Sequence, residues 1–145
     1  MTEISLITKE DLPFIRALEE KLFSDPWDEN SLFSWLSGSG AKGYVLKVDG
    51  VRASYALFQT ICGEGELLRC GVEPQFSRKG LTFTLLSFAL EKEKNENTKR
   101  IFLEVRKNNL PAKNLYEKLG FRLLGERKNY YHKPTDDALI YEKIL

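Results

Sequence analysis

The sequence predicts one α/β domain with a mixed β-sheet, largely antiparallel, and helices on both faces of the sheet. Three observations support this prediction. The segment 44–58 contains two β-rich runs joined by Asp49-Gly50, a dipeptide strongly associated with two-residue hairpin turns. Beyond it, strand-like and helix-like segments alternate, as they do in α/β folds. The 145 residues, of which 42% are hydrophobic, suffice for a single domain with one sizeable core.

The N-terminal part begins with a short strand at residues 4–8, which is followed by two helices. Over residues 8–23 the apolar side chains recur every three or four positions, which is the period of a helix with one buried face. Thr8 is a suitable N-cap because its hydroxyl can accept a hydrogen bond from a backbone N–H group of the first turn. Residues 28–40 predict a second short helix, which ends in glycine and serine.

The central part continues from the hairpin into a strand at residues 63–72 and then into a helix. The polar run 91–100, which ends this helix, is interpreted as a solvated helix end and loop. The segment "RIFLEV", residues 100–105, is rich in apolar residues and predicts a buried strand. A further helix over residues 109–120 ends at Gly120, a suitable C-cap.

Two strands, at residues 121–131 and 138–145, close the chain around a polar loop. The predicted order of elements is therefore β-α-α-β-β-β-α-β-α-β-β. No repeat, linker or low-complexity segment interrupts this order, so we expect one domain over residues 1–145. His132 is the only histidine. It lies in the polar loop without a partner motif for nucleophilic catalysis or metal binding, so we expect a surface residue and no metal site.

Composition and charge argue against several classes of function. The chain has 22 basic and 21 acidic residues, so it lacks the basic excess that is typical of nucleic-acid-binding proteins. No apolar run approaches the ~20 residues of a membrane span. The N-terminus does not show a basic region followed by an apolar stretch, so we expect no signal peptide. Cys62 and Cys70 have no CxxC spacing, and we expect two free thiols in a cytoplasmic protein.

The stretch "VEPQFSRKGLTFTLL", residues 72–86, has features of a phosphate-binding turn. It leads from a strand end into a helix, and a helix N-terminus presents unpaired backbone N–H groups and the positive end of the helix dipole. Gly80 permits a positive φ or the close approach of a ligand, and Arg78 and Lys79 add positive charge. A glycine in a strand-to-helix turn is more often structural, so this pattern alone leaves both interpretations open.

A second group of residues lies in "LEVRKNNLPAKNLYEKLGF", residues 103–121. Glu104 is near the end of a predicted strand, and Tyr116 is on the following helix. A carboxylate and a phenol in these positions can converge on one cleft at the sheet edge. The alternatives are a strand-end Glu104 paired with Arg106 or a nearby lysine, and a Tyr116 that only covers the core.

These two segments resemble the GCN5-related N-acetyltransferase (GNAT) superfamily. "VEPQFSRKGLTFTLL" is similar to its acetyl-CoA-binding motif. "LEVRKNNLPAKNLYEKLGF" is close to the signature of its RimI-like branch, the ribosomal-protein-alanine N-acetyltransferases. "DPWDENSL" and "KNYY…DDALI" also resemble that branch, so the resemblance spans nearly the whole chain. It implies a GNAT-like fold in which splayed central strands form the acetyl-CoA cleft.

The resemblance also implies roles for the matching residues, with acetyl-CoA as co-substrate and no metal. Glu104 matches the general base and Tyr116 the general acid of a direct transfer through a ternary complex. We choose the backbone N–H group of Val72 as the donor to the developing oxyanion. The residues that match the pantetheine-binding strand, the pyrophosphate loop and one further cofactor contact are Cys70, Gly71, Val72, Arg78, Lys79, Gly80, Leu81, Thr82, Phe83 and Asn109.

The loop departs from the family pattern at two positions. The pattern is Gln or Arg, two residues, Gly, one residue, and then Gly or Ala, whereas here Ser77 stands first and Thr82 last. The Thr82 hydroxyl can bond a phosphate oxygen, or the branched side chain can crowd the phosphates. Because most donors in such a loop are backbone N–H groups, we expect acetyl-CoA binding to survive.

The acceptor implied by the resemblance is the N-terminal alanine of a small-subunit ribosomal protein. Trp27 and Tyr131 lie in segments that flank the acceptor groove of this fold, although ordinary packing is the alternative for both. Two other functions stay open: a small-amine acetyltransferase, and a non-catalytic acyl-CoA-binding or protein-interaction module. The altered loop favours the module, and the presence of both Glu104 and Tyr116 opposes it. We expect a monomer or a weak dimer.

Overall fold

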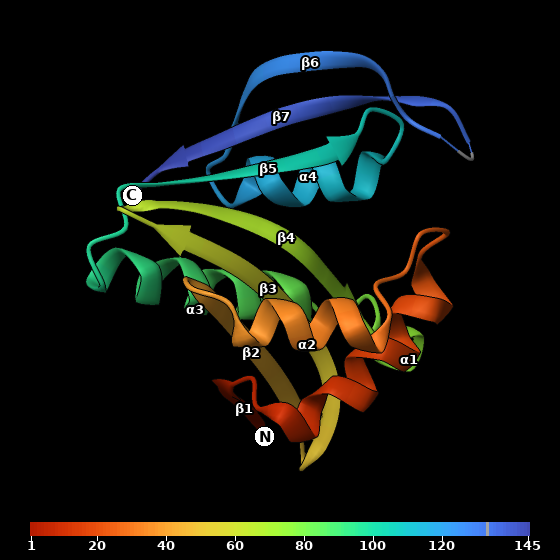
Figure 1. Cartoon of the computed structure of the whole chain (residues 1–145), viewed down its shortest axis with the longest axis vertical. Coiled ribbons are helices and arrows are strands. Elements are labelled where there is room, and N and C mark those ends of the chain that lie inside the picture. Colours follow the sequence, from red (N-terminus) through yellow and green to blue (C-terminus); the bar gives the residue numbers. More distant parts are fainter. Residues whose placement is uncertain (133) are drawn as a thin grey trace.

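The computed structural model of the chain describes residues 1–132 and 134–145. Within them, seven strands form one mixed sheet in the order β1-β2-β3-β4-β5-β7-β6 (Figure 1). The strands are β1 (Thr2–Leu6), β2 (Ala41–Val48), β3 (Val51–Ile61), β4 (Glu64–Val72), β5 (Arg100–Arg106), β6 (Arg122–Tyr131) and β7 (Asp136–Ile144). The helices are α1 (Leu12–Leu22), α2 (Glu29–Ser37), α3 (Leu81–Asn95) and α4 (Leu110–Lys118), with 3-10 turns at Lys9–Asp11 and Pro74–Phe76. The predicted α/β class and order of elements are confirmed.

The local signals that predicted the hairpin and the helix ends are found in the backbone. Asp49 and Gly50 both have positive φ, at 49° and 82°, as a type I′ hairpin turn requires. Gly120 follows the end of α4 with a φ of 95° and so terminates the helix in a left-handed conformation. The start of α1 differs from the prediction. Thr8 precedes the 3-10 turn, where its backbone N–H donates to the Asp11 carboxylate at 2.8 Å, and the α-helix begins only at Leu12.

The centre of the sheet contains its one parallel pair of strands, β4 and β5, and this pair separates. Strands β1 to β4 are mutually antiparallel, as are β5, β7 and β6. Between the two groups, β4 and β5 pair only from Glu64–Glu66 to Arg100–Phe102. Beyond these residues the strands diverge, so the sheet is split on one side (Figure 1). The splayed central strands that the family resemblance implied are confirmed, whereas the sheet-edge position considered from the residues alone is wrong.

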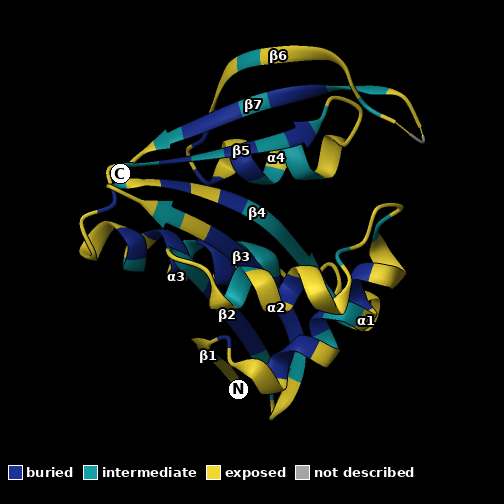
Figure 2. Cartoon of the chain, in the orientation of Figure 1, coloured by how far each residue is buried: buried dark blue, intermediate teal, exposed yellow. Residues whose placement is uncertain are grey.

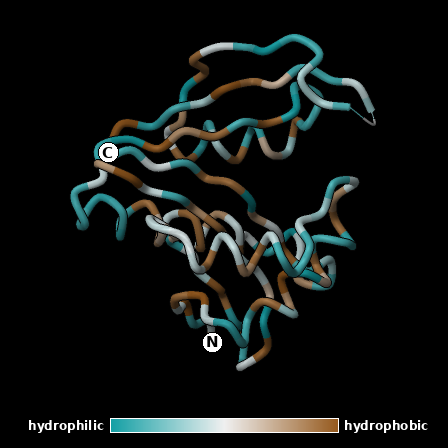
Figure 3. The backbone as a smooth tube through the Cα atoms, in the orientation of Figure 1, coloured by the Kyte–Doolittle hydropathy of each residue, from teal (hydrophilic) through white to brown (hydrophobic). Residues whose placement is uncertain are grey.

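Helices cover both faces of the sheet and create two core clusters. On one face α1 and α2 pack over Val45, Tyr55 and Leu57. On the other, α3 and α4 pack over the larger cluster, which includes Phe58 and Leu103. Figure 2 shows the buried residues concentrated along the central strands, and Figure 3 shows the hydrophobic residues following the same course. No helix in the described ranges combines the length and apolar character needed to cross a membrane.

Two predictions about burial are corrected. Strand β5 is not buried on both faces: Ile101 and Leu103 are buried, whereas Glu104 on the opposite face is only partly covered. In the polar run that ends α3, Glu93 is fully buried rather than solvated. Its carboxylate accepts hydrogen bonds from the hydroxyl of Thr98 at 2.6 Å and the hydroxyl of Thr60 at 3.2 Å. The prediction failed because two hydroxyl donors, from residues that lie far from each other in the sequence, offset part of the cost of burying this carboxylate.

Candidate active site

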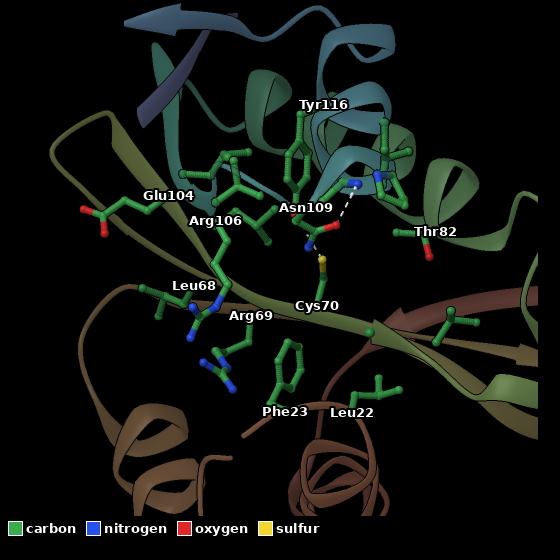
Figure 4. Close-up of a pocket in the computed structure, with 18 of the residues that line it drawn as sticks. Leu22, Phe23, Leu68, Arg69, Cys70, Thr82, Glu104, Arg106, Asn109 and Tyr116 are labelled. Atoms are coloured by element: carbon green, nitrogen blue, oxygen red, sulfur yellow. Dashed lines mark hydrogen bonds between the residues drawn. The ribbon is translucent and has the colours of Figure 1, made fainter. Parts of the chain in front are cut away.

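A cavity of about 800 Å³ fills the space where β4 and β5 diverge. This volume lies in the range of small-molecule binding sites. Its walls come from β4, β5, the C-terminal end of α1, the start of α3, α4 and the last residue of β6, so six elements meet around it (Figure 4). The predicted site residues that line the cavity are Cys70, Gly71, Val72, Thr82, Glu104, Asn109, Tyr116 and Tyr131.

Strand β4 turns backbone N–H groups toward this cavity. Opposite β3, Leu57 pairs with Arg69 and Phe58 pairs with Leu67, so Leu68 is an extra residue that forms a β-bulge and bends the strand. Farther on, the N–H group of Glu73 donates to the Ala53 carbonyl of β3 at 2.8 Å. Because successive backbone groups of a strand point to opposite sides, the N–H groups of Val72 and Cys70 face the side from which β5 has separated. They are donors available to a ligand.

The start of α3 presents a second set of backbone donors. Gly80 is the N-cap residue, with a φ of 72°, and supplies no side chain to cap the helix. The first helical bond at this end runs from the Thr84 N–H group to the Gly80 carbonyl at 3.0 Å. The N–H groups of residues 81–83 therefore have no partner within the helix, which favours an anion at this position. Arg78, also left-handed at a φ of 62°, and Lys79 are exposed beside the turn.

The side chains of the predicted loop residues differ in where they point. The Thr82 side chain lines the cavity, whereas Leu81 is buried in the core and can offer a ligand only its backbone. Phe83 faces a separate hollow, where the Lys118 ammonium lies 4.8 Å from its ring centre. The Ser77 hydroxyl donates to the Pro74 carbonyl at 2.7 Å, so it closes its own turn. The loop can therefore act mainly through its backbone.

Tyr116 directs its hydroxyl into the cavity from α4. The residue is 8% exposed, and its ring packs edge-on against Phe121 at 5.9 Å between centres. Its oxygen lies 3.5 Å from the Cys70 sulfur (Figure 4). Burial, together with Cys70, raises the pKa of Tyr116 well above its ordinary value, so the phenol is protonated at neutral pH. Asn109 caps α4 by accepting from the Ala112 N–H group at 3.2 Å.

Glu104 approaches the same cavity from the other face of the sheet. Leu103 and Val105 point toward α3 and α4, so Glu104 between them points toward the face that carries α1 and α2. Figure 4 shows its carboxylate directed away from Tyr116. An oxygen of Glu104 lies 3.6 Å from an Arg127 nitrogen of β6. Arg106 is not its partner, which corrects that alternative: Arg106 donates to the carbonyls of His132 and Pro134.

The two aromatic residues predicted to contact the acceptor differ in position. Tyr131 lines the cavity, with the Arg106 guanidinium 4.4 Å from its ring centre. Burial, followed by the nearby Glu104 charge, raises the pKa of Tyr131 to about 12. Trp27 does not line the cavity. It packs against the core cluster of α1 and α2, and the guanidinium of Arg69, a residue that lines the cavity, lies 5.9 Å from its ring centre.

A buried ion pair that the sequence analysis missed supports the cavity wall. Glu19 of α1 is fully buried and accepts from Arg69 at 2.6 and 3.0 Å, from the Trp27 N–H group at 3.0 Å, and from the Tyr55 hydroxyl. Arg69 also lies 4.3 Å from the Phe23 ring centre. Removing one member of such a pair costs about 3–5 kcal/mol of stability. The sequence did contain a signal, since Glu19 falls on the apolar face of its helix.

Within the described part of the chain, His, Cys, Asp and Glu side chains form no group of three or more that could hold a metal ion. A sheet split at its centre, backbone donors on β4 and an uncapped helix start beside it together form a site that suits a ligand with an extended polar arm and an anionic group, as the co-substrate of an acyltransferase has. Residues 9–121 match the model of the acetyltransferase (GNAT) family. The chain belongs to this GNAT family.

Curated relatives at 33% identity are ribosomal-protein-alanine N-acetyltransferases, the RimI-like branch. The ribosomal protein bS18-alanine N-acetyltransferase of Salmonella typhimurium is 33% identical, over 97% of this chain and 95% of its own length. The enzyme of that name from Escherichia coli strain K12 is 33% identical, over 95% of this chain and 91% of its own. The crystal structure of the ribosomal-protein-S18-alanine N-acetyltransferase from Escherichia coli has a TM-score of 0.93 and 31% identity, over 99% of this chain and 94% of that one.

Proposed function

We propose that this acetyltransferase moves an acetyl group from acetyl-CoA to the α-amino group of a protein N-terminus, and that a ribosomal protein is its acceptor. One observation carries the proposal. Glu104 and Tyr116 line one cavity but reach it from opposite faces of the sheet. An acceptor and a donor can therefore enter from different sides and meet between β4 and β5. The acceptor is inferred from the relatives, whose names specify the alanine of ribosomal protein bS18.

Acetyl-CoA supplies the acetyl group as an activated thioester. The chain offers it backbone N–H groups as hydrogen-bond donors, on β4 and at the start of α3. The free N–H groups of residues 81–83 bind the pyrophosphate, and the positive end of α3 favours its charge. The space around Gly80 is open, with no atom within 4 Å of an added Cβ. The Cys70 N–H group binds the pantetheine arm, and the Val72 N–H group donates to the acetyl oxygen as negative charge develops there.

Glu104 acts as the general base. An α-ammonium group has a pKa of about 8 and must lose a proton before its nitrogen can attack. The Glu104 carboxylate is partly exposed at the face that α1, α2 and Tyr131 enclose, so it can accept this proton directly or through water. The ion pair with Arg127 holds the Glu104 carboxylate at the cavity. Because a carboxylate accepts several hydrogen bonds, Glu104 can still accept one from the substrate amine or from water.

Tyr116 acts as the general acid. The leaving group of the transfer is a thiolate, and a phenol that stays protonated at neutral pH can give it a proton. The Tyr116 hydroxyl enters from the face of α3 and α4, the face on which the start of α3 offers its anion-binding N–H groups. Base and acid are thus separated by the sheet. This separation keeps the base from simply exchanging a proton with the acid.

Calorimetric titration with acetyl-CoA is expected to show one site per chain. The Gly80→Ala variant should bind about tenfold more weakly, because a left-handed φ costs a residue with a Cβ about 1–2 kcal/mol and the loop relaxes. Gly50→Ala is the matched control: it has the same backbone strain at a φ of 82°, equally open space, and no contact with the cavity. A wild-type protein that binds no acetyl-CoA at millimolar concentration would overturn the proposal.

A further inference from the structure

We propose that Cys70 is a positioning residue for proton donation by Tyr116: its thiol donates a hydrogen bond to the phenol oxygen and so directs the phenol proton toward the leaving sulfur. The inference rests on the proposed function, in which Tyr116 is the general acid. It assigns to the Cys70 side chain a task separate from that of the Cys70 backbone, which faces the cofactor.

The geometry brings two polar groups together in a largely apolar wall. Cys70 of β4 and Tyr116 of α4 belong to the same core cluster, and both line the cavity. Their sulfur and oxygen atoms are 3.5 Å apart, a contact drawn as a dashed line in Figure 4. Among the residues that the structure describes, this is the only polar contact of the Tyr116 hydroxyl. The direction of the hydroxyl hydrogen therefore depends on this thiol, while the ring is held by Phe121.

The proton can lie on either atom of the pair, and the surroundings favour the thiol as donor to the phenol oxygen. Burial raises the pKa of Cys70, so the group is a thiol and has a proton to donate. A phenol oxygen that accepts from sulfur keeps its own hydrogen free to point into the cavity. The opposite arrangement, with the phenol donating to sulfur, would turn the reactive hydrogen away from the leaving group.

The proton transfer balances with this arrangement. The O–H bond of Tyr116 breaks, an S–H bond forms on the departing thiolate, and a phenolate remains. The Cys70 S–H group donates to that phenolate and stabilises its charge, which the buried setting otherwise penalises. Water returns a proton to the phenolate after the products leave. Cys70 neither gains nor loses a covalent bond.

A double-mutant cycle in kcat tests the proposal. Cys70→Ala is expected to lower kcat about fivefold, or about 1 kcal/mol, without changing the KM for acetyl-CoA. Cys70→Ser restores a donor and should return kcat to within about twofold of wild type. In the Tyr116→Phe background the hydroxyl is absent, so Cys70→Ala should have no further effect. Cys62→Ala, at an exposed thiol away from the cavity, is the matched control.

Two results of this cycle would overturn the proposal. If Cys70→Ala lowers kcat equally with and without the Tyr116 hydroxyl, the thiol only fills space. If Cys70→Ser is as slow as Cys70→Ala, hydrogen bonding is not what the residue supplies. Melting temperatures of all variants separate these outcomes from a general loss of folded protein.

The hydrogen bond between Cys70 and Tyr116 can also be tested by Raman spectroscopy, without measuring enzyme activity. In the Cys62→Ala protein, Cys70 is the one remaining thiol, since the sequence has two cysteines. Its S–H stretching band in the Raman spectrum should lie below that of a free thiol, and Tyr116→Phe should move the band back. An unshifted band in the protein with Tyr116 would overturn the hydrogen bond. A shifted band in a protein without transferase activity would support the hydrogen bond and contradict the proposed acetyltransferase function.

Discussion

Replacement of Tyr116 by phenylalanine is expected to lower kcat about a hundredfold while the KM for acetyl-CoA stays near its wild-type value. A positioned general acid contributes about 10²–10⁴ to the rate. The substitution removes only the hydroxyl and keeps the ring that packs on Phe121, so the fold and the cavity wall are preserved. Steady-state rates of CoA release at saturating acetyl-CoA measure this effect.

Tyr44→Phe is the matched control for this change. Tyr44 is also buried, but its hydroxyl has no hydrogen-bond partner among the described residues and it does not line the cavity. Its loss should leave kcat unchanged. A Tyr116→Phe protein with full activity would exclude Tyr116 as the acid, because an aromatic ring cannot substitute for a proton donor.

The substitution Glu104→Gln is expected to lower kcat/KM about a hundredfold below pH ~8, with a smaller effect at higher pH. Below the α-amino pKa most of the acceptor is protonated, so the base is needed. Above it the amine loses its proton to solvent, and the loss of the carboxylate matters less. Profiles of kcat/KM against pH for the wild type and the variant, with one peptide acceptor, measure the difference.

Glu66→Gln is the control for the pH profile. Partial desolvation and the charge of Glu104 raise the pKa of Glu66, so this carboxyl, which does not line the cavity, is the other candidate for a pH effect near Glu104. Its variant should keep the wild-type profile. Equal rates for Glu104→Gln and wild type at every pH would contradict the base role, and a constant ratio across the range would indicate a positional effect instead.

Much of the fold could be predicted from the sequence because its signals are local. The Asp49-Gly50 turn, the helical period of α1 and the glycine after α4 each depend on a few neighbouring residues. Glu104 and Tyr116, twelve residues apart, lie on a strand and the next helix and do line one cavity. The family could also be predicted from the sequence, because its motifs are short and contiguous.

The remaining features depend on contacts between distant segments. Whether β4 separates from β5 is decided by pairing partners more than thirty residues apart, so the residues alone suggested a cleft at the sheet edge and only the family resemblance indicated splayed central strands. The pair of Glu19 and Arg69 spans 50 residues and joins a helix to a strand. Arg69 lines the cavity and contacts Trp27, whereas Trp27 itself does not line the cavity.

Acetylation of a protein N-terminus by this chain can be measured as the release of CoA from acetyl-CoA in the presence of different acceptors. The acceptors are a peptide with a free N-terminal alanine, the same peptide blocked at its N-terminus, and a set of polyamines and free amino acids. We predict rapid release with the free peptide, one acetyl group on its α-nitrogen by mass spectrometry, and no release above background with the others. Faster release with a small amine, or no release with any acceptor by a protein that binds acetyl-CoA, would contradict the account.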